Sequence, residues 1–300
     1  MDLNLTDLPV DAPAVRYMRP DPRLMPYISG YHAYAAGRIG GGPYHEWFFP
    51  GWANVRFRLA SAPWQLGYGD AAPEEVPEMV LFGPSRSGAH SISQGGHLVG
   101  FGVTPLGWHR LFRDPAQRFA DRLTPLDGLW PAARPMQDAL RDARTTADVV
   151  RIFNAHLLGA LRPASPDEAL IARLFDLLVE DHDLDLRKAA VAMGCSPQKL
   201  RRISIAHFGF PPKILLRRSR FLKSLVAIVG TEPGQWSQRI SASYFDQSHF
   251  IRDSHYFLGM KPGAFLALDR PLAMLSIKAR QAALGAPFQA LHRLGASSTA

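Results

Sequence analysis

Only one cysteine, Cys195, occurs in a sequence of 300 residues. A single cysteine excludes an internal disulfide framework and a zinc site made of several cysteines, and it is typical of a reducing compartment. The sequence also lacks any stretch approaching the roughly 20 apolar residues that span a bilayer. Residues 1–11 include acidic side chains and no apolar run, which does not fit a signal peptide. We therefore expect a cytoplasmic protein without a membrane segment, in which Cys195 is a small packing residue.

Sequence motifs of catalysis are equally scarce. There is no Gly-x-Ser-x-Gly nucleophile elbow and no phosphate-binding loop. His32, His45 and Glu46 are the nearest approach to a metal site, but the close His-x-His pair and spaced carboxylate of a cupin metal centre are absent. The sequence therefore predicts no catalytic residues, no metal and no cofactor.

Charge is unevenly distributed along the chain. The net charge is +8, and residues 186–262 hold 13 Lys or Arg against 3 Asp or Glu. Residues 1–164 hold 16 against 15, so that half of the chain is close to neutral. Basic charge concentrated in one segment of a chain predicts a polyanionic partner, such as nucleic acid.

The same basic segment contains an internal repeat, in which residues 196–212 and 246–262 follow one pattern fifty positions apart. Each copy has a capping residue, a large apolar residue four positions on, an arginine six positions on, and then a glycine and a proline. The matched pairs are Ser196 and Asp246, Leu200 and Phe250, Arg202 and Arg252, Gly209 and Gly259, and Pro212 and Pro262. Such a repeat indicates a duplicated supersecondary unit. Its sequence favours a short helix, a turn and a second basic helix.

Hydrophobic periodicity divides the chain into a β-rich and an α-rich part. Val55, Phe57 and Leu59 alternate with Arg56 and Arg58, which is the period of a strand with one buried face. Short segments of this kind fill residues 15–104, helices follow, and prolines near residues 163–166 mark a boundary. We expect an α+β fold with a β-rich, cupin-like barrel or sandwich with helices over residues 1–162, and a helical or disordered tail over 270–300. Between them, an all-α domain over 163–269 holds two helix-turn-helix units joined by a linker helix, with helices at 186–193, 197–208, 212–229, 233–242 and 247–257.

The residues of the second copy resemble a known family. Tyr244–Asp253, closed by Gly259-Met260-Lys261-Pro262, is similar to the signature of the AraC/XylS family of bacterial transcription regulators, and the resemblance covers residues 167–268. Residues 209–213 and 217–221 resemble the linker helix of the family. Residues 48–51, 81–84 and 99–107 resemble its β-rich sensing domains. The sequence departs from the family pattern at Ser204, where an aromatic residue is usual, and at Arg239 and Ser243.

The resemblance implies a regulator that reads two major-groove half-sites of double-stranded operator or promoter DNA. It also implies a small-molecule effector bound by the N-terminal domain, self-association as a homodimer, and contact with RNA polymerase if the protein is an activator. Two other functions stay open at this point. One is a cupin-like enzyme with a basic accessory domain, and the other is a protein that binds nucleic acid without sequence preference.

Candidate site residues follow from the repeat and from side-chain chemistry, since Arg, Lys and Gln can bond base edges and other basic residues can hold phosphates. For DNA contact in the first unit they are Ser196, Gln198, Lys199, Arg201 and Arg202. In the second unit they are Gln247, Ser248, His249, Ile251 and Arg252. For phosphate contact they are Lys213, Arg217, Arg218 and Lys261. For an N-terminal ligand pocket they are Trp47, Phe49, Phe57, Trp64 and Tyr68.

Each assignment has a plain structural alternative. Arg217 and Arg218 also fit an ordinary solvated helix face, and Arg202 and Arg252 also fit intramolecular ion pairs. His249 can cap or pack its helix rather than contact DNA. The aromatic residues of the N-terminal domain are also explained by a hydrophobic core.

Overall fold

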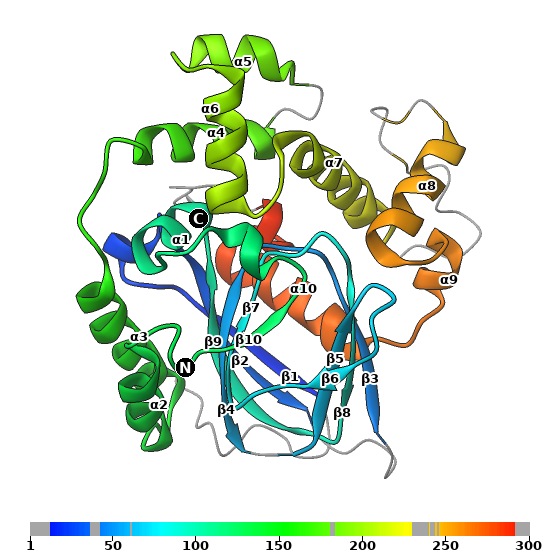
Figure 1. The fold of residues 1–300 in the computed structure, drawn as a ribbon. Helices are drawn as coiled ribbons and strands as arrows, with labels where there is room; N and C mark the ends of the chain where they lie inside the picture. Colours follow the sequence, from blue (N-terminus) through cyan, green and yellow to red (C-terminus); the bar gives the residue numbers. More distant parts are fainter. Residues whose placement is uncertain are drawn as a thin grey trace.

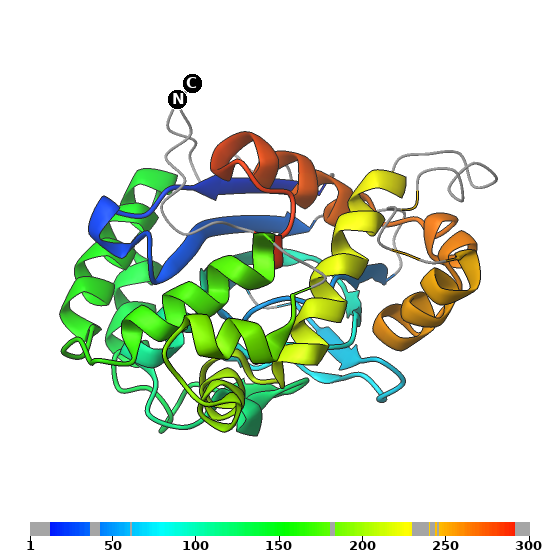
Figure 2. The ribbon, with the colours of Figure 1, turned by 90° about the horizontal axis from the view of Figure 1, so that it is seen from above.

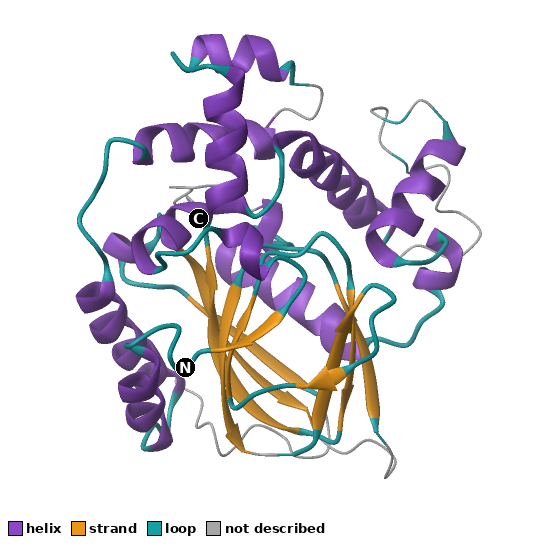
Figure 3. Ribbon diagram, viewed as in Figure 1, coloured by secondary structure: helices purple, strands orange, loops and turns teal. Residues whose placement is uncertain are grey.

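The structure is a computed structural model that describes residues 13–36, 43–60, 62–180, 184–229, 240, 244 and 246–291. The N-terminal half forms antiparallel strands and the C-terminal half consists of helices, so the expected α+β class is confirmed (Figures 1 and 3). The helix expected at 233–242, and the sequence departures at Arg239 and Ser243, lie outside the described residues.

Two antiparallel sheets face each other in the N-terminal half, and together they form its barrel. The larger sheet has the order β1-β2-β9-β4-β7-β10, and the smaller has the order β3-β8-β5-β6. The larger sheet consists of β1 (Ala14–Met18), β2 (Ile28–Ala36), β9 (Gly96–Val103), β4 (Asn54–Ala60), β7 (Met79–Phe82) and β10 (Leu123–Pro125). The smaller sheet consists of β3 (Tyr44–Phe48), β8 (Ala89–Ser93), β5 (Trp64–Tyr68) and β6 (Glu74–Glu75). Short helical turns at η2 (Pro22–Leu24) and η3 (Ala116–Phe119) complete the connections.

The alternation along β4 is present, but both faces of the strand are buried. Val55 and Phe57 face outward from the pair of sheets and pack against α2 (Ala133–Arg141) and α3 (Thr146–Ala160), with the Phe57 ring centroid 6.1 Å from that of Phe153. Arg56 faces the space between the two sheets and is only 9% exposed. The expectation of a single buried face was therefore wrong, because the polar phase of this strand lines the interior of the barrel.

The helical half follows α1 (Pro105–Leu111), α2 and α3, after the prolines of residues 163–166. Its elements are α4 (Glu168–Glu180), α5 (Leu186–Ala192), α6 (Pro197–Ile203), the π-helical turn η4 (Ser204–Phe208), α7 (Pro212–Ile228), α8 (Gln247–Leu258) and α9 (Pro262–Leu266). Phe175, Phe208 and Leu222 are at the centre of the core of these helices, and Trp52 and Leu106 from the N-terminal half belong to the same cluster. The hydrophobic core of the helices is thus continuous with residues of the barrel side.

The last described helix, α10 (Pro271–Leu284), does not stay with the helical half. It packs on β1 and β3 of the barrel, and η6 (Gln289–Leu291) lies against α7 (Figures 1 and 2). Its first turn is held by Glu46 of β3, whose carboxylate accepts bonds from the backbone amides of Leu272 at 2.6 Å and Ala273 at 3.2 Å. A carboxylate is stabilised at a helix N-terminus by these free amides. Across the described stretches, no helix combines the length and apolar character needed to cross a bilayer.

Candidate nucleic-acid interface

The first basic helix has the local chemistry that its sequence predicts. The Ser196 hydroxyl accepts a bond from the Lys199 amide at 3.1 Å, which caps the helix where Pro197 begins it. Leu200 is buried against α5, and the helical path continues through the π-helical turn to Phe208. With Leu200 on its buried side, α6 has its opposite side exposed at the surface of the helical half.

The second basic helix, α8, repeats this geometry fifty residues later. The Asp246 carboxylate accepts a bond from the His249 amide at 2.6 Å, and Phe250 is buried as Leu200 is. Gly209 and Gly259 end the two helical paths with φ angles of 85° and 75°, a left-handed conformation in which glycine is strongly favoured. The duplicated pattern in the sequence is therefore a duplicated structure at the helix that follows each turn.

A further matched pair of residues was not singled out from the sequence. The Ser204 hydroxyl donates to the Phe210 carbonyl at 2.6 Å, and the Ser254 hydroxyl donates to the Met260 carbonyl at 2.7 Å. Both serines are buried and fix the backbone just past the glycine that ends each helical path. The signal was available, because the two serines occupy the same position of the fifty-residue repeat. Ser204 departs from the family pattern, and its bond gives that departure a structural role.

The residues predicted to read DNA fall into an exposed group and a half-buried group. Lys199 pairs with Asp167 at 3.3 Å, His249 packs edge-on against Tyr244 with ring centroids 5.0 Å apart, and Ile251 is half-buried. Arg201, Arg202 and Arg252 have no acidic partner within the described part of the chain. The exposed candidates are Ser196, Gln198, Arg201 and Arg202 in the first unit, and Gln247, Ser248 and Arg252 in the second.

The four candidate phosphate contacts have very different surroundings. Lys213 and Lys261 are exposed near the ends of the two units. Arg217 instead donates to the Asp253 carboxylate at 2.7 Å, and its guanidinium lies 4.2 Å from the ring centroid of Tyr256. This places Arg217 between the linker helix α7 and α8, with its Nε engaged inside the protein.

Arg218 is inside the molecule, 1% exposed, at the junction of α7 and the barrel. Its Nη1 donates to the carbonyls of Gly51 at 3.0 Å and Ser85 at 2.7 Å, and its guanidinium lies 4.1 Å from the ring centroid of Trp52. Burial lowers the pKa of Arg218 to about 9. In this arrangement the side chain joins the linker helix to two barrel loops and does not face solvent.

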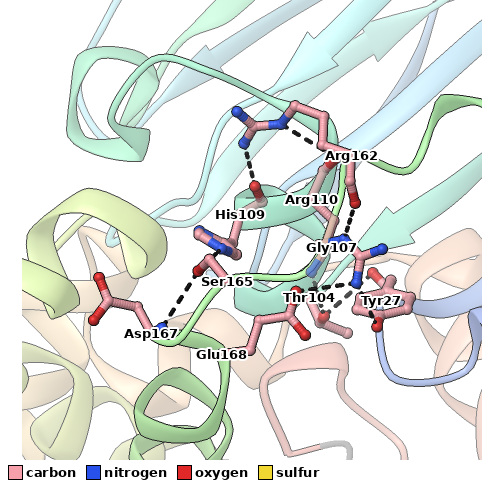
Figure 4. A network of polar contacts seen from close by, with 9 residues as sticks. All are labelled: Tyr27, Thr104, Gly107, His109, Arg110, Arg162, Ser165, Asp167 and Glu168. Atoms are coloured by element: carbon pink, nitrogen blue, oxygen red, sulfur yellow. Dashed lines mark hydrogen bonds and ion pairs between the residues drawn. The ribbon is translucent and has the colours of Figure 1, made fainter.

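A polar network joins the two halves at the predicted boundary (Figure 4). Arg110 of α1 donates to the Glu168 carboxylate of α4 at 3.0 Å and to the Tyr27 hydroxyl at 2.9 Å. The Arg162 amide donates to the Arg110 carbonyl at 2.9 Å, and the Arg162 side chain donates to the carbonyls of His109 and Phe112. The boundary is therefore a bonded junction, in which α1 holds the chain on both sides of residues 163–166.

Two histidines lie edge to face at this junction. His109 bonds the Ser165 hydroxyl at 2.7 Å, and its ring centroid is 4.9 Å from that of His207 in the first unit. Burial, and after it the neighbouring His109, lowers the pKa of His207 to about 4. Burial also lowers the pKa of His109. Both rings are consequently neutral at physiological pH, and protonation would place positive charge in the contact between α1 and the first unit.

Three of the five residues expected to line a ligand pocket line a cavity of the barrel, and the other two do not line the same cavities. Phe49 and Tyr68 line a cavity of about 120 Å³ between the barrel and α10, and Trp64 lines a neighbouring cavity of about 40 Å³. Trp47 stacks on His90 at a centroid distance of 4.6 Å, away from both cavities, and Phe57 faces α3. Among the described residues there is no group of three or more His, Cys, Asp or Glu able to hold a metal ion.

Comparisons with known proteins give structural similarities only. No family model and no curated protein matches the sequence. The chain is similar to ToxT from Vibrio cholerae, with 10% identity and a TM-score of 0.45 over 79% of this chain and 97% of that chain. A ToxT structure with bound unsaturated fatty acid, from Vibrio cholerae strain SCE256, aligns at 11% identity and a TM-score of 0.42 over 85% and 94%.

The structure described as the AraC-like transcriptional activator CuxR aligns at 13% identity and a TM-score of 0.27 over 80% of this chain and 99% of that chain. AraC is also the family that residues 167–268 resemble in sequence. Identities and TM-scores this low assign no function to the chain, so its function has to be inferred from the geometry of its own residues.

Proposed function

We propose that this protein is a sequence-specific DNA-binding transcription regulator of the AraC type, which reads two major-groove half-sites with α6 and α8. The observation that carries the proposal is the duplicated geometry of these helices. Each is capped at its first residue, closed by a buried serine bond, and presents an exposed arginine, Arg202 or Arg252, at the same position of the repeat. An α-helix fits the major groove, and an arginine can bond both guanine acceptors there.

The surroundings of the two arginines support contact with DNA over the structural alternative. Neither Arg202 nor Arg252 has an acidic partner among the described residues, so an intramolecular ion pair does not account for their charge. Gln198 and Ser248 are exposed beside them and add side chains able to bond base edges. Lys213 and Lys261 are the exposed lysines that we assign to phosphates. Arg217 and Arg218 we assign to positioning of α7, since each bonds a group inside the protein.

We further propose that the barrel is the sensing part of the regulator and binds a small-molecule effector. The support is the cavity of about 120 Å³ that the barrel forms with α10. In this proposal, residues 1–162 and α10 act together as the sensor, and residues 163–269 read the DNA. The helix α6 continues directly into η4, and η4 contacts α1 and η3 of the proposed sensor.

The test is a selection of bound duplexes from a random DNA pool at near-physiological salt. The wild type is compared with Arg202→Ala/Arg252→Ala and with Arg134→Ala/Arg151→Ala, which removes the same charge from exposed positions on α2 and α3. We expect two enriched half-sites roughly 34 Å apart. The first double variant should lose about 1–3 kcal/mol of base discrimination at each half-site, whereas the second should keep the motif.

Other outcomes separate the competing functions. Tight binding without any enriched motif, falling steeply with salt, would identify a non-specific nucleic-acid-binding protein. Equal loss of the motif in both double variants would show that net charge, and not these two positions, determines binding. Either result would overturn sequence reading by α6 and α8.

A further inference from the structure

One loop of the barrel contacts both copies of the repeat. This β7–β8 loop runs from Gly83 to Gly88. A Cβ atom at Gly209, which ends the first helical path, would lie 2.5 Å from the Pro84 Cγ, so the proline ring packs directly on this glycine. Further along the loop, the Gly88 amide donates to the Phe257 carbonyl in the last turn of α8 at 2.6 Å. Both contacts fall near the C-terminal ends of the two helical paths that the repeat relates.

The other contacts of the β7–β8 loop follow the order of the helical half. The Ser85 carbonyl accepts a bond from Arg218 of α7 at 2.7 Å. Arg86 lies beside α8, where its guanidinium is 5.4 Å from the ring centroid of Tyr256. Along its length, the loop therefore contacts the first unit, then the linker helix, and then the second unit.

The bond from Gly88 gives α8 an attachment outside the helical half. The last carbonyls of a helix have no partner within that helix, and the Phe257 carbonyl is one of them. Because α7 and α8 are separate helices, the chain alone does not fix the angle between them. The pair of Arg217 with Asp253 holds α8 to α7, and the bond from Gly88 holds it to the barrel.

The β7–β8 loop is itself held by bonds to Asp121. The Asp121 Oδ1 accepts bonds from the Arg86 amide at 2.8 Å and from the Ser87 amide at 3.0 Å. The Asp121 amide donates to the Pro84 carbonyl at 3.1 Å. These three bonds fix the backbone of the loop between its contact with the first unit and its contact with the second.

The backbone of Asp121 has an unusual conformation. Its φ angle is 52°, and it is the one residue other than glycine with a positive φ among those that the structure describes. Such a conformation is strained and persists only where the surrounding bonds determine it. The bonds between Asp121 and the loop do so here, so that Asp121 and the β7–β8 loop form one rigid piece.

We propose that the β7–β8 loop, braced by Asp121, is a rigid spacer that sets the relative placement of α6 and α8, and with it the separation of the half-sites that the protein accepts. A protein with two reading helices binds half-sites whose spacing follows its own geometry. The effect on DNA rests on the proposed function, whereas the placement of the two units does not require DNA. The spacing preference is thus determined outside the helices that contact bases.

Four variants separate the spacer from general effects on the fold. Asp121→Gly removes the side-chain bonds to the loop, and glycine adopts the left-handed backbone without strain. Asp121→Asn is its matched control, because asparagine also tolerates this conformation and keeps an Oδ1 acceptor. Asp127→Gly is a second control, which removes an exposed carboxylate that pairs with Arg134. Pro84→Ala acts by a different route, since it removes the ring that packs on Gly209.

The first measurement is the distance between two spin labels on the full chain without DNA. The labels are attached at Val191→Cys in α5 and at His255→Cys in α8, both exposed positions, in a chain that also carries Cys195→Ala. We expect a narrow distribution of distances for this chain, and for the same chain with Asp121→Asn or Asp127→Gly. Asp121→Gly and Pro84→Ala should widen the distribution about twofold, while each variant still unfolds within about 5 °C of the unmodified chain.

The second measurement uses the half-sites from the DNA selection, joined by spacers that change by one base pair at a time. Each base pair changes the separation by about 3.4 Å, so the wild type should bind one spacing about tenfold more tightly than its neighbours. Asp121→Gly should reduce this preference to about threefold or less. Its binding to a single half-site should stay unchanged, because the variant leaves α6 and α8 intact.

The proposal is overturned if Asp121→Gly keeps both the narrow distribution and the spacing preference, if Asp121→Asn and Asp121→Gly behave alike, or if Asp127→Gly changes both measurements as strongly. Weaker binding of Asp121→Gly to single half-sites would show damage to the reading helices and would also contradict it. A widened distribution in a protein that enriches no DNA motif would leave the spacer standing and remove only its effect on DNA.

Discussion

Arg217 of α7 and Asp253 of α8 form an ion pair of 2.7 Å in which the carboxylate is fully buried, 0% exposed. The second oxygen of the same carboxylate accepts a bond from the Tyr244 hydroxyl at 2.8 Å. Asp253 thus fixes α8 to α7 and to the segment that precedes α8. Since a buried carboxylate depends on its partners, the placement of the second reading helix depends on this pair.

Asp253→Asn should lower the free energy of unfolding by about 3 kcal/mol, because it breaks a buried pair and leaves Arg217 without its charged partner. Urea unfolding measures the change. Asp167→Asn is the matched control, since Asp167 forms only an exposed pair with Lys199 and should change stability by less than about 1 kcal/mol. Equal effects of the two substitutions would contradict the assigned role. In the DNA selection, Asp253→Asn should weaken the second half-site more than the first.

Arg218→Met should loosen the contact between α7 and the barrel, because the carbonyls of Gly51 and Ser85 lose their shared donor. The Gly51 carbonyl keeps its bond from the Ser85 amide at 2.9 Å, so the Ser85 carbonyl is the acceptor that loses this donor. A buried carbonyl without its donor is expected to lower the free energy of unfolding by about 1–3 kcal/mol. Hydrogen exchange should increase at the backbone amides of residues 51–52 and 85–86. Arg201→Met, at an exposed position of α6, should leave both measurements unchanged, and protection equal to the wild type in Arg218→Met would refute the contact.

Acid should weaken the junction between the halves through His207. The pKa of His207 is lowered from 6.5 to about 4 in the folded protein, first by burial and then by His109. Between these two pH values the unfolded chain binds the proton more readily, so this contribution to stability is complete above about pH 6.5 and is lost as the pH falls toward 4. The size of the effect is roughly 2 kcal/mol, allowing for partial solvent exposure.

The measurement is the Tm of the wild type and His207→Gln between pH 4 and pH 8. The Tm difference between the two proteins should change through this window, because the variant lacks the group that titrates. Asp167 and Arg162 also face the histidine and remain in both proteins. His255→Gln, at an exposed position of α8, should follow the wild type at every pH. Parallel curves for wild type and His207→Gln would rule out this origin of acid sensitivity.

The paired serines of the repeat offer a test of the duplicated structure. Ser204→Ala and Ser254→Ala should each lower the free energy of unfolding by about 1–2 kcal/mol, since each removes a buried bond to a carbonyl. Ser224→Ala is the matched control, because the buried Ser224 hydroxyl has no partner among the described residues, and this change should be neutral or stabilising. If the two substitutions lower the free energy of unfolding by very different amounts, the two copies of the repeat are not stabilised in the same way at their ends.

The reading helices were predictable because their signals are local. A capping residue and a closing glycine predicted both helical paths to within about one residue, when α6 is taken together with η4. Pro197 at the first helical position marks only α6. The strand β4 was predictable for the same reason, from the alternation of Val55, Phe57 and Leu59 with two arginines. Local patterns of this kind depend on neighbours a few positions away, which the sequence displays directly.

The features that were missed depend on contacts between distant segments. Alternation along β4 cannot show that Arg56 faces a closed interior, because a polar residue on one phase looks the same whether solvent or a second sheet lies there. Arg217 and Arg218 are adjacent in a basic helix, yet Asp253 and the carbonyls of Gly51 and Ser85 decide where their charges go. The packing of α10 on β1 and β3 is likewise not indicated by any local pattern in the sequence.

The Glu46 carboxylate of β3 accepts bonds from the first turn of α10. Helix α10 therefore lies on the N-terminal sheets, although it comes after the helical half in the sequence. After the strands and α1 to α3, the chain forms the helices α4 to α9 and then returns with α10, from residue 271, to pack on β1 and β3. Under the proposed function, the part that reads DNA would be an insertion within the part that senses the effector, connected to it at both ends. Cutting the chain before residue 271 would therefore remove α10 from the barrel and expose the faces of β1 and β3 that it covers.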